Sequence, residues 1–91
     1  MAEIDTLARD AELDARITFL DDLQIMDADF SGFHFENSEI TNRFYDRLER
    51  AIRETGEEKW FFMVNLNGTR IDNSAWTAYS RRGRALNLAH S

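Results

Sequence analysis

Apolar residues along the chain change from helical to strand spacing and back, and each change marks a predicted element. Residues 2–14 carry apolar residues at helical spacing without a breaker, which predicts a short amphipathic helix. Apolar and polar residues then alternate over 16–19 and 23–26 on either side of Asp21-Asp22, which predicts a β-hairpin with a two-residue turn. Ser31-Gly32 interrupts the apolar pattern that follows and indicates a bulge or an irregular stretch.

The clearest helical pattern lies in residues 37–56. Its apolar residues are four apart, at Ile40, Phe44, Leu48 and Ile52. Asn37 or Ser38 is expected to cap the start, and Gly56 is placed to end the helix. The charged residues of the opposite face predict a solvated surface with i,i+4 ion pairs.

Two further elements complete the pattern. Residues 59–66, KWFFMVNL, are apolar without alternation, which predicts a strand covered on both faces. Residues 73–88 predict a last helix, in which Ala75, Tyr79, Arg82 and Leu86 fall along one line.

This order predicts an α/β fold, with α+β as the alternative: a small mixed sheet with an N-terminal hairpin, helices on one face and a right-handed crossover. We divide the chain into an N-terminal helical arm, residues 1–15, and a domain, residues 16–91. A crossover helix normally returns to the sheet with another strand, so the sheet is expected to lack its last strand. Either residues outside this sequence supply that strand, or a partner or the arm protects the edge.

Composition narrows the class of protein. The 91 residues suffice for one domain with a modest core, and the absence of cysteine excludes disulfides and thiolate metal sites. No apolar run is long enough to span a membrane, and the acidic N-terminus lacks the organisation of a signal peptide. We therefore expect a cytoplasmic protein with no membrane partner.

The net charge of −6 is unevenly distributed. Residues 1–58 hold 16 acids and 6 bases, whereas residues 59–91 hold 1 acid and 5 bases. The two parts either attract each other within one fold or carry solvated faces. Alternatively, Arg81, Arg82 and Arg84 form a basic patch that meets an acidic partner or a phosphate. Nucleic acid is not expected as a partner, because the chain as a whole is acidic.

Residues able to carry enzymatic chemistry are scarce. His34 and His90 are the only histidines, and neither belongs to a pair at metal-ligand spacing. The acidic pairs Asp21-Asp22 and Asp27/Asp29 lack a surrounding calcium loop, and the chain has no phosphate-binding glycine motif. We expect no catalytic residue, no metal and no cofactor.

The segment RIDNSAW, residues 70–76, joins the apolar strand to the last helix. Asp72, Asn73 and Ser74 are all favoured at an N-cap, so one of them is expected to bind the free N–H groups of the helix. An exposed serine hydroxyl at a helix start is also a candidate for phosphorylation, because the helix dipole stabilises the added negative charge.

The longer segment FFMVNLNGTRIDNSAW resembles the signature of STAS domains, the anti-sigma-factor antagonist fold. Val64-Asn65-Leu66 resembles the end of the family's strand, and Ile71-Asp72-Asn73-Ser74 resembles its apolar-Asp-Ser-Ser motif. Asn73 stands where the family has its first serine, and Ala75 where it has glycine. The resemblance covers roughly residues 16–90. It implies that Ser74 is phosphorylated and that the partner is a regulatory kinase or an anti-sigma-type protein.

These features predict a non-enzymatic regulatory domain that binds a protein through the loop 72–76 and the helix after it. The candidate partner-binding residues are Asp72, Asn73, Ser74, Trp76, Tyr79, Arg81, Arg82 and Arg84. One alternative is a domain that binds a lipid or another apolar small ligand, in a pocket lined by Trp60, Phe61, Phe62, Trp76 and Tyr79, unless these residues are core. A second alternative is an oligomerisation module, because the sheet looks incomplete, and a homo-oligomer is compatible with each reading.

Overall fold

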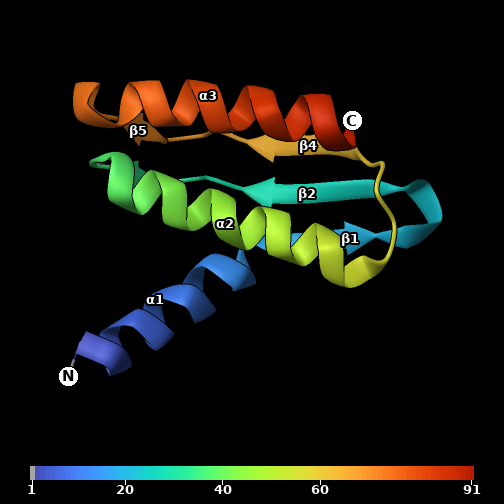
Figure 1. The fold of residues 1–91 in the computed structure, drawn as a ribbon, viewed down its shortest axis with the longest axis horizontal. Helices are drawn as coiled ribbons and strands as arrows, with labels where there is room; N and C mark the ends of the chain where they lie inside the picture. The colour runs from blue at the N-terminus through green and yellow to red at the C-terminus, as the bar shows by residue number, and fades with distance from the viewer. Residues whose placement is uncertain (1) are drawn as a thin grey trace.

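A computed structural model describes the backbone of residues 2–91 and the side chains of residues 7–91. Its elements follow one another along the chain as shown in Figure 1. They are α1 (Ala2–Ala15), β1 (Ile17–Leu20), the 3₁₀ helix η1 (Asp21–Leu23), β2 (Ile25–Asp29), β3 (His34–Phe35), α2 (Ser38–Thr55), β4 (Phe61–Asn65), β5 (Arg70–Ile71) and α3 (Asn73–His90).

The sheet is mixed, as predicted. Its strand order is β1-β2-β4, with β1 antiparallel and β4 parallel to β2, while β3 and β5 form a short parallel pair beyond it. Figure 1 shows α2 and α3 side by side on one face of this sheet. When the strands in the figure are turned to point upward, β4 lies to the right of β2 with α2 in front, so the crossover is right-handed. The predicted mixed α/β fold is confirmed.

The hairpin is confirmed, but its turn is longer than the two residues predicted. Ile17 pairs with Ala28 and Leu20 with Ile25, and the connection consists of η1 and Gln24. Gln24 has a φ of 55°, a left-handed conformation, and its side chain donates a hydrogen bond to the carbonyl of Lys59 at 3.0 Å. Asp21-Asp22 lacks the glycine that two-residue turns favour, so the chain makes a helical turn instead.

Helix α2 begins and ends where its sequence predicts. The side chain of Asn37 accepts a hydrogen bond from the Ile40 N–H at 3.0 Å, which caps the helix. Gly56 has a φ of 78°, the left-handed conformation in which glycine ends a helix without strain. Phe44, Leu48 and Ile52 are buried on the face that meets the sheet.

The core beneath α2 is largely aromatic. Phe44 is fully buried, and its ring lies 4.9 Å from that of Phe30 and 5.0 Å from that of Phe33, measured between centroids. Phe35 stacks on Phe44 with an interplanar angle of 20° and also meets Tyr79 of α3 edge-on. One cluster therefore joins α2, α3 and the β3 region.

The prediction that the charged face of α2 is solvated is wrong where other helices pack against it. Two of its arginines hold the helical arm α1: Arg43 bonds Asp10 at 2.8 Å, and Arg47 bonds Asp14 at 2.6 Å. The Arg47 guanidinium lowers the pKa of the Asp14 carboxyl. The i,i+4 pairing that was predicted occurs between Arg50 and Glu54.

Strand β4 differs most from its prediction. It was expected to be covered on both faces, yet Phe61 is 73% exposed, Met63 48% and Val64 43%. β4 is an edge strand, and α3 packs mainly on α2 rather than on β4. An apolar run without alternation does not reveal how many neighbours a strand has, which explains the error.

The burial of Tyr45 predicts a stability that falls in alkali. Burial between α2 and α3 raises the pKa of this hydroxyl above its usual value of about 10. Because the folded state holds the proton more tightly than the unfolded state, Tyr45 stabilises the fold below pH 10 and loses this contribution as pH rises further. We expect Tyr45→Phe to flatten the decline of unfolding free energy above pH 10 in urea titrations. Parallel pH profiles for the two proteins would contradict this.

Candidate functional site

The pairing of β5 with β3 positions the first turn of α3. The N–H of Asp72 donates to the carbonyl of Phe35 at 3.0 Å, which extends the pairing of β5 with β3 to the start of the helix. Asp72 occupies the N-cap position, but its side chain makes no capping hydrogen bond. The prediction that Asp72, Asn73 or Ser74 caps the helix through its side chain is therefore wrong.

The carboxylate of Asp72 turns to His34 instead. Its Oδ1 lies 3.0 Å from His34 Nε2, a distance that gives an ion pair when the imidazole is protonated. Nε2 itself has no hydrogen-bond partner among residues 7–91. The Asp72 carboxylate thus lies beside His34 instead of capping the helix, a placement that depends on the fold rather than on local sequence.

The Ser74 hydroxyl is also engaged. It is exposed, and its Oγ donates a hydrogen bond of 2.6 Å to the carbonyl of Glu36, in the loop before α2. Ser74 therefore joins the start of α3 to the start of α2, which lie far apart in the sequence. Asn73 is exposed beside it.

Trp76 and Tyr79 lie on α3 just after this turn. Their rings stack, with centroids 5.9 Å apart and an interplanar angle of 19°. Trp76 is 55% exposed, whereas Tyr79 is half-buried against the aromatic core, where burial raises the pKa of its hydroxyl. Tyr79 is thus a rigid support under an exposed indole.

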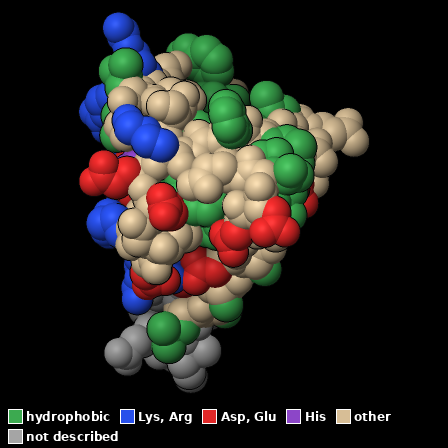
Figure 2. Space-filling view, turned by 90° about the vertical axis from the view of Figure 1, so that its right-hand side faces the viewer, with side chains coloured by type: hydrophobic (Ala, Val, Ile, Leu, Met, Phe, Trp, Pro, Cys, Tyr) green, Lys and Arg blue, Asp and Glu red, His purple; other side chains and the backbone are tan. Residues whose placement is uncertain are grey.

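The outer face of α3 forms a shallow groove of about 550 Å³. Arg81 and Arg84 line it, and neither forms an ion pair with a side chain of residues 7–91. The other lining residues are Trp76, Thr77, Ser80, Ala85 and Leu88. Figure 2 shows hydrophobic side chains next to basic ones at the top of the molecule, where α3 lies, and acidic side chains together with further basic ones lower down.

Arg82 does not belong to this basic surface, contrary to prediction. Its side chain is only 16% exposed, because it reaches across to α2. There it bonds Asp46 at 2.8 Å and Glu49 at 3.1 Å, and it also contacts the Tyr45 ring and the side chain of Asn42. Of the three adjacent arginines, two face outward and one ties the helices together.

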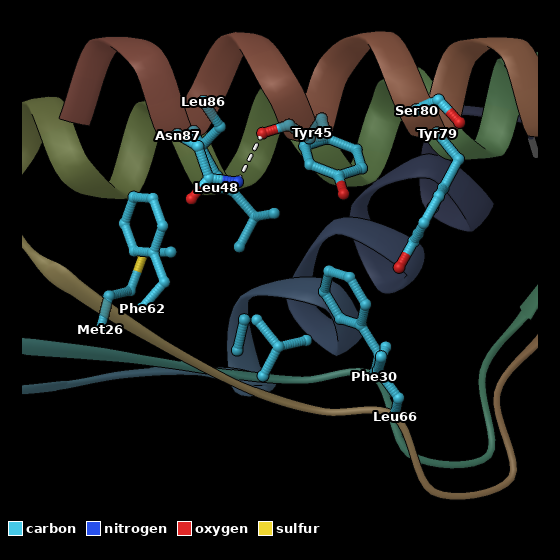
Figure 3. Close-up of a pocket in the computed structure, with 13 residues that line it drawn as sticks. Met26, Phe30, Tyr45, Leu48, Phe62, Leu66, Tyr79, Ser80, Leu86 and Asn87 are labelled. Carbon is cyan, nitrogen blue, oxygen red and sulfur yellow. Dashed lines mark hydrogen bonds between the residues drawn. The ribbon is translucent and has the colours of Figure 1, made fainter. Parts of the chain in front are cut away.

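A second cavity, of about 370 Å³, opens between α3 and the sheet (Figure 3). Met26, Leu48, Phe62 and Leu86 supply apolar lining, and Ser80 and Asn87 lie at its α3 side. Of the five aromatic residues proposed for an apolar ligand pocket, only Phe62 and Tyr79 line it. Trp60 is buried against Phe19, Phe61 is exposed, and Trp76 lines the outer groove.

Leu88 and Ser80 belong to the outer groove but were not predicted. Leu88 is 75% exposed, and both residues continue the row of every fourth residue that starts at Trp76 and passes through Arg84. Residues four apart lie next to each other on one face of a helix, so this spacing in the sequence could have predicted that both residues belong to the groove.

The described residues hold no cluster of three or more His, Asp or Glu side chains that could bind a metal ion. Nor does any helix of residues 2–91 combine the length and apolarity needed to cross a bilayer.

No protein-family model, curated protein or solved structure matches the chain. The resemblance to STAS domains stays a prediction.

Proposed function

We propose that the chain is a non-enzymatic regulatory domain that binds an acidic segment of a protein partner on the outer face of α3. The observation that carries the proposal is the exposed Trp76, stacked on Tyr79 and followed on the same face by two arginines without ion-pair partners in residues 7–91.

Each part of this surface suits protein recognition. Trp and Arg are the residue types that most often dominate binding energy, and the stack on Tyr79 limits the entropy that Trp76 loses on binding. The guanidinium groups of Arg81 and Arg84 favour acidic partners and speed their encounter. The resemblance to STAS domains suggests a regulatory kinase or an anti-sigma-type protein as this partner.

Phosphorylation of Ser74 is the switch in this proposal. A phosphate ester has no proton to donate to the Glu36 carbonyl, so the link between α3 and the loop before α2 is lost. The phosphate also adds nearly two negative charges close to Asp72, at one end of the binding surface. The added charge weakens the binding of an acidic partner.

The experiment places a photo-crosslinking amino acid at Thr77, inside the outer groove, and identifies the captured protein by mass spectrometry. We expect the crosslinker at Thr77 to capture a partner. The same crosslinker at Asp21, an exposed control position on η1, should not capture this protein. Titration calorimetry with this partner is then expected to show a loss of about 2 kcal/mol for Trp76→Ala. Ser74→Glu should also weaken binding, while Ser74→Ala should not.

Capture at Thr77 that equals capture at Asp21 would contradict the proposal. So would an unchanged affinity of Trp76→Ala for the captured partner. If Trp76→Ala weakens binding but Ser74→Glu does not, the partner surface stands and the switch fails.

A further inference from the structure

The outer edge of β4 carries backbone groups that no strand of residues 2–91 pairs with. The Phe61 N–H donates to Gln24 and the Asn65 carbonyl accepts from Phe30, so both residues point their backbone groups toward β2. Strand geometry turns the backbone groups of every second residue the other way. The N–H and C=O groups of Phe62 and Val64 therefore point to the open side of the sheet.

This free stretch has defined ends. At one end, the Trp60 N–H donates to the carbonyl of His90 at 2.7 Å. At the other end, the Leu66 carbonyl accepts from the Thr69 N–H at 3.0 Å. Two donors and two acceptors thus remain between them, centred on Met63.

Nothing in the sequence of this edge protects it against pairing. Residues 60–66 include no charged residue, proline or glycine, the devices that usually blunt edge strands. The side chains of Phe61, Met63, Val64 and Leu66 are between 43% and 73% exposed. An apolar, uncharged and unguarded edge is a template for another strand.

We propose that β4 pairs with β4 of a second copy of this chain, antiparallel about a two-fold axis through Met63. In this register Phe62 of each copy lies opposite Val64 of the other copy. The free N–H and C=O groups of both residues then all form hydrogen bonds. Moving the register by two residues would require backbone groups of Trp60 or Leu66 that are already bonded. The strand is therefore complementary to itself in one register.

Residues 59–91 contain one acid and five basic residues, so two copies that meet here bring basic residues together, a repulsion that salt screens. The two-fold axis, perpendicular to the sheet, keeps both α3 helices on one face. The open side of the 370 Å³ cavity, next to Val64 and Leu66, then meets its counterpart in the second copy.

The surface that β4 offers to a second copy is small. The four exposed side chains at β4 offer on the order of 400 Å² of surface, about half of what each partner buries in a standard interface. Contacts from α3, at Ser80, Gly83 and Asn87, must supply the remainder. We therefore expect a dimer that dissociates on dilution.

Cysteine cross-linking tests the register directly, because the chain has no cysteine of its own. In the proposed pairing the two copies of residue 63 form a non-hydrogen-bonded pair with Cα atoms about 4.5 Å apart, within disulfide range. Mild oxidation of Met63→Cys is expected to give mostly covalent dimer. The control Leu23→Cys, on η1 and 63% exposed, is expected to stay mostly monomeric.

Sedimentation of the uncross-linked chain over a range of concentrations gives the second measurement. Val64→Lys should raise the dimer dissociation constant at least about 100-fold, because the interface would bury an unpaired charge. Leu23→Lys makes the same change of charge away from the edge and should leave the constant unchanged. Circular dichroism checks that both variants fold.

Three results would overturn the proposal: a monomer at all concentrations, a dimer that Val64→Lys does not weaken, or equal cross-linking at positions 23 and 63. Trp76 lies outside this edge, so a failure here leaves the proposed partner surface on α3 standing.

Discussion

Phe44→Ala is expected to lower the free energy of unfolding by about 3–5 kcal/mol. Phe44 has no exposed surface, and its ring contacts three other phenylalanines, Phe30, Phe33 and Phe35, so truncation leaves a cavity at the centre of the aromatic core. Small domains have only about 5–15 kcal/mol of total stability, so the loss takes a large fraction of it. Urea denaturation followed by circular dichroism measures the change.

Two matched variants separate loss of packing from loss of an apolar residue. Phe44→Leu keeps most of the volume and is expected to cost less than about half as much as Phe44→Ala. Leu88→Ala removes an apolar side chain that is 75% exposed, so its effect should stay within about 0.5 kcal/mol. Similar losses for Phe44→Ala and Leu88→Ala would show that this cluster is not the core on which stability depends.

The parts of the fold that the sequence predicts well are those with local causes. The bounds of α2 follow from apolar residues four apart, from the side chain of Asn37 and from the left-handed Gly56, all within one segment. The hairpin strands follow from alternation, which sets the register between Ile17 and Ala28. The crossover follows from the order of elements, because right-handed connections are strongly favoured.

The errors concern features that depend on distant neighbours. The exposure of β4 depends on whether another strand lies beside it and on where α3 packs, and neither is encoded in an apolar run. The Asp72 side chain does not cap α3 but lies 3.0 Å from Nε2 of His34, which belongs to a different strand. Ser74 bonds Glu36 for the same kind of reason: β3 and β5 pair, which brings the two loops together.

The spacing of the arginines along α3 contains information that a count of their charges does not use. Arg82 falls on the line of Ala75, Tyr79 and Leu86, which face the interior, while Arg81 lies about 100° around the helix from it. Assigning each arginine to a face of the helix would have separated Arg82 from Arg81 and Arg84, which are exposed. The outer groove was therefore partly predictable, whereas the partner of Arg82 on α2 was not.

Arg82→Met is expected to lower the free energy of unfolding by about 2 kcal/mol. Arg82 donates to Asp46 and Glu49 of α2, and hydrogen bonds to charged groups contribute more than neutral ones. The combined contribution of these two contacts to stability is reduced, because Asp46 is 68% exposed and water screens its pair with Arg82. Methionine keeps an apolar side chain of similar length but removes the guanidinium, whose carbon lies 5.8 Å from the Tyr45 ring centroid, so thermal and urea unfolding report mainly the loss of the charged contacts.

A double-mutant cycle with Glu49→Gln separates the ion pair from the rest of the Arg82 side chain. Glu49 is 31% exposed, so we expect a coupling energy of about 1 kcal/mol that falls as salt is added. Arg81→Met, which removes an outward-facing charge, should change stability by no more than about 0.5 kcal/mol. If Arg81→Met costs as much as Arg82→Met, α3 is not held to α2 through Arg82. The two surfaces that depend on the position of α3, the outer groove and the cavity above β4, would then need another anchor.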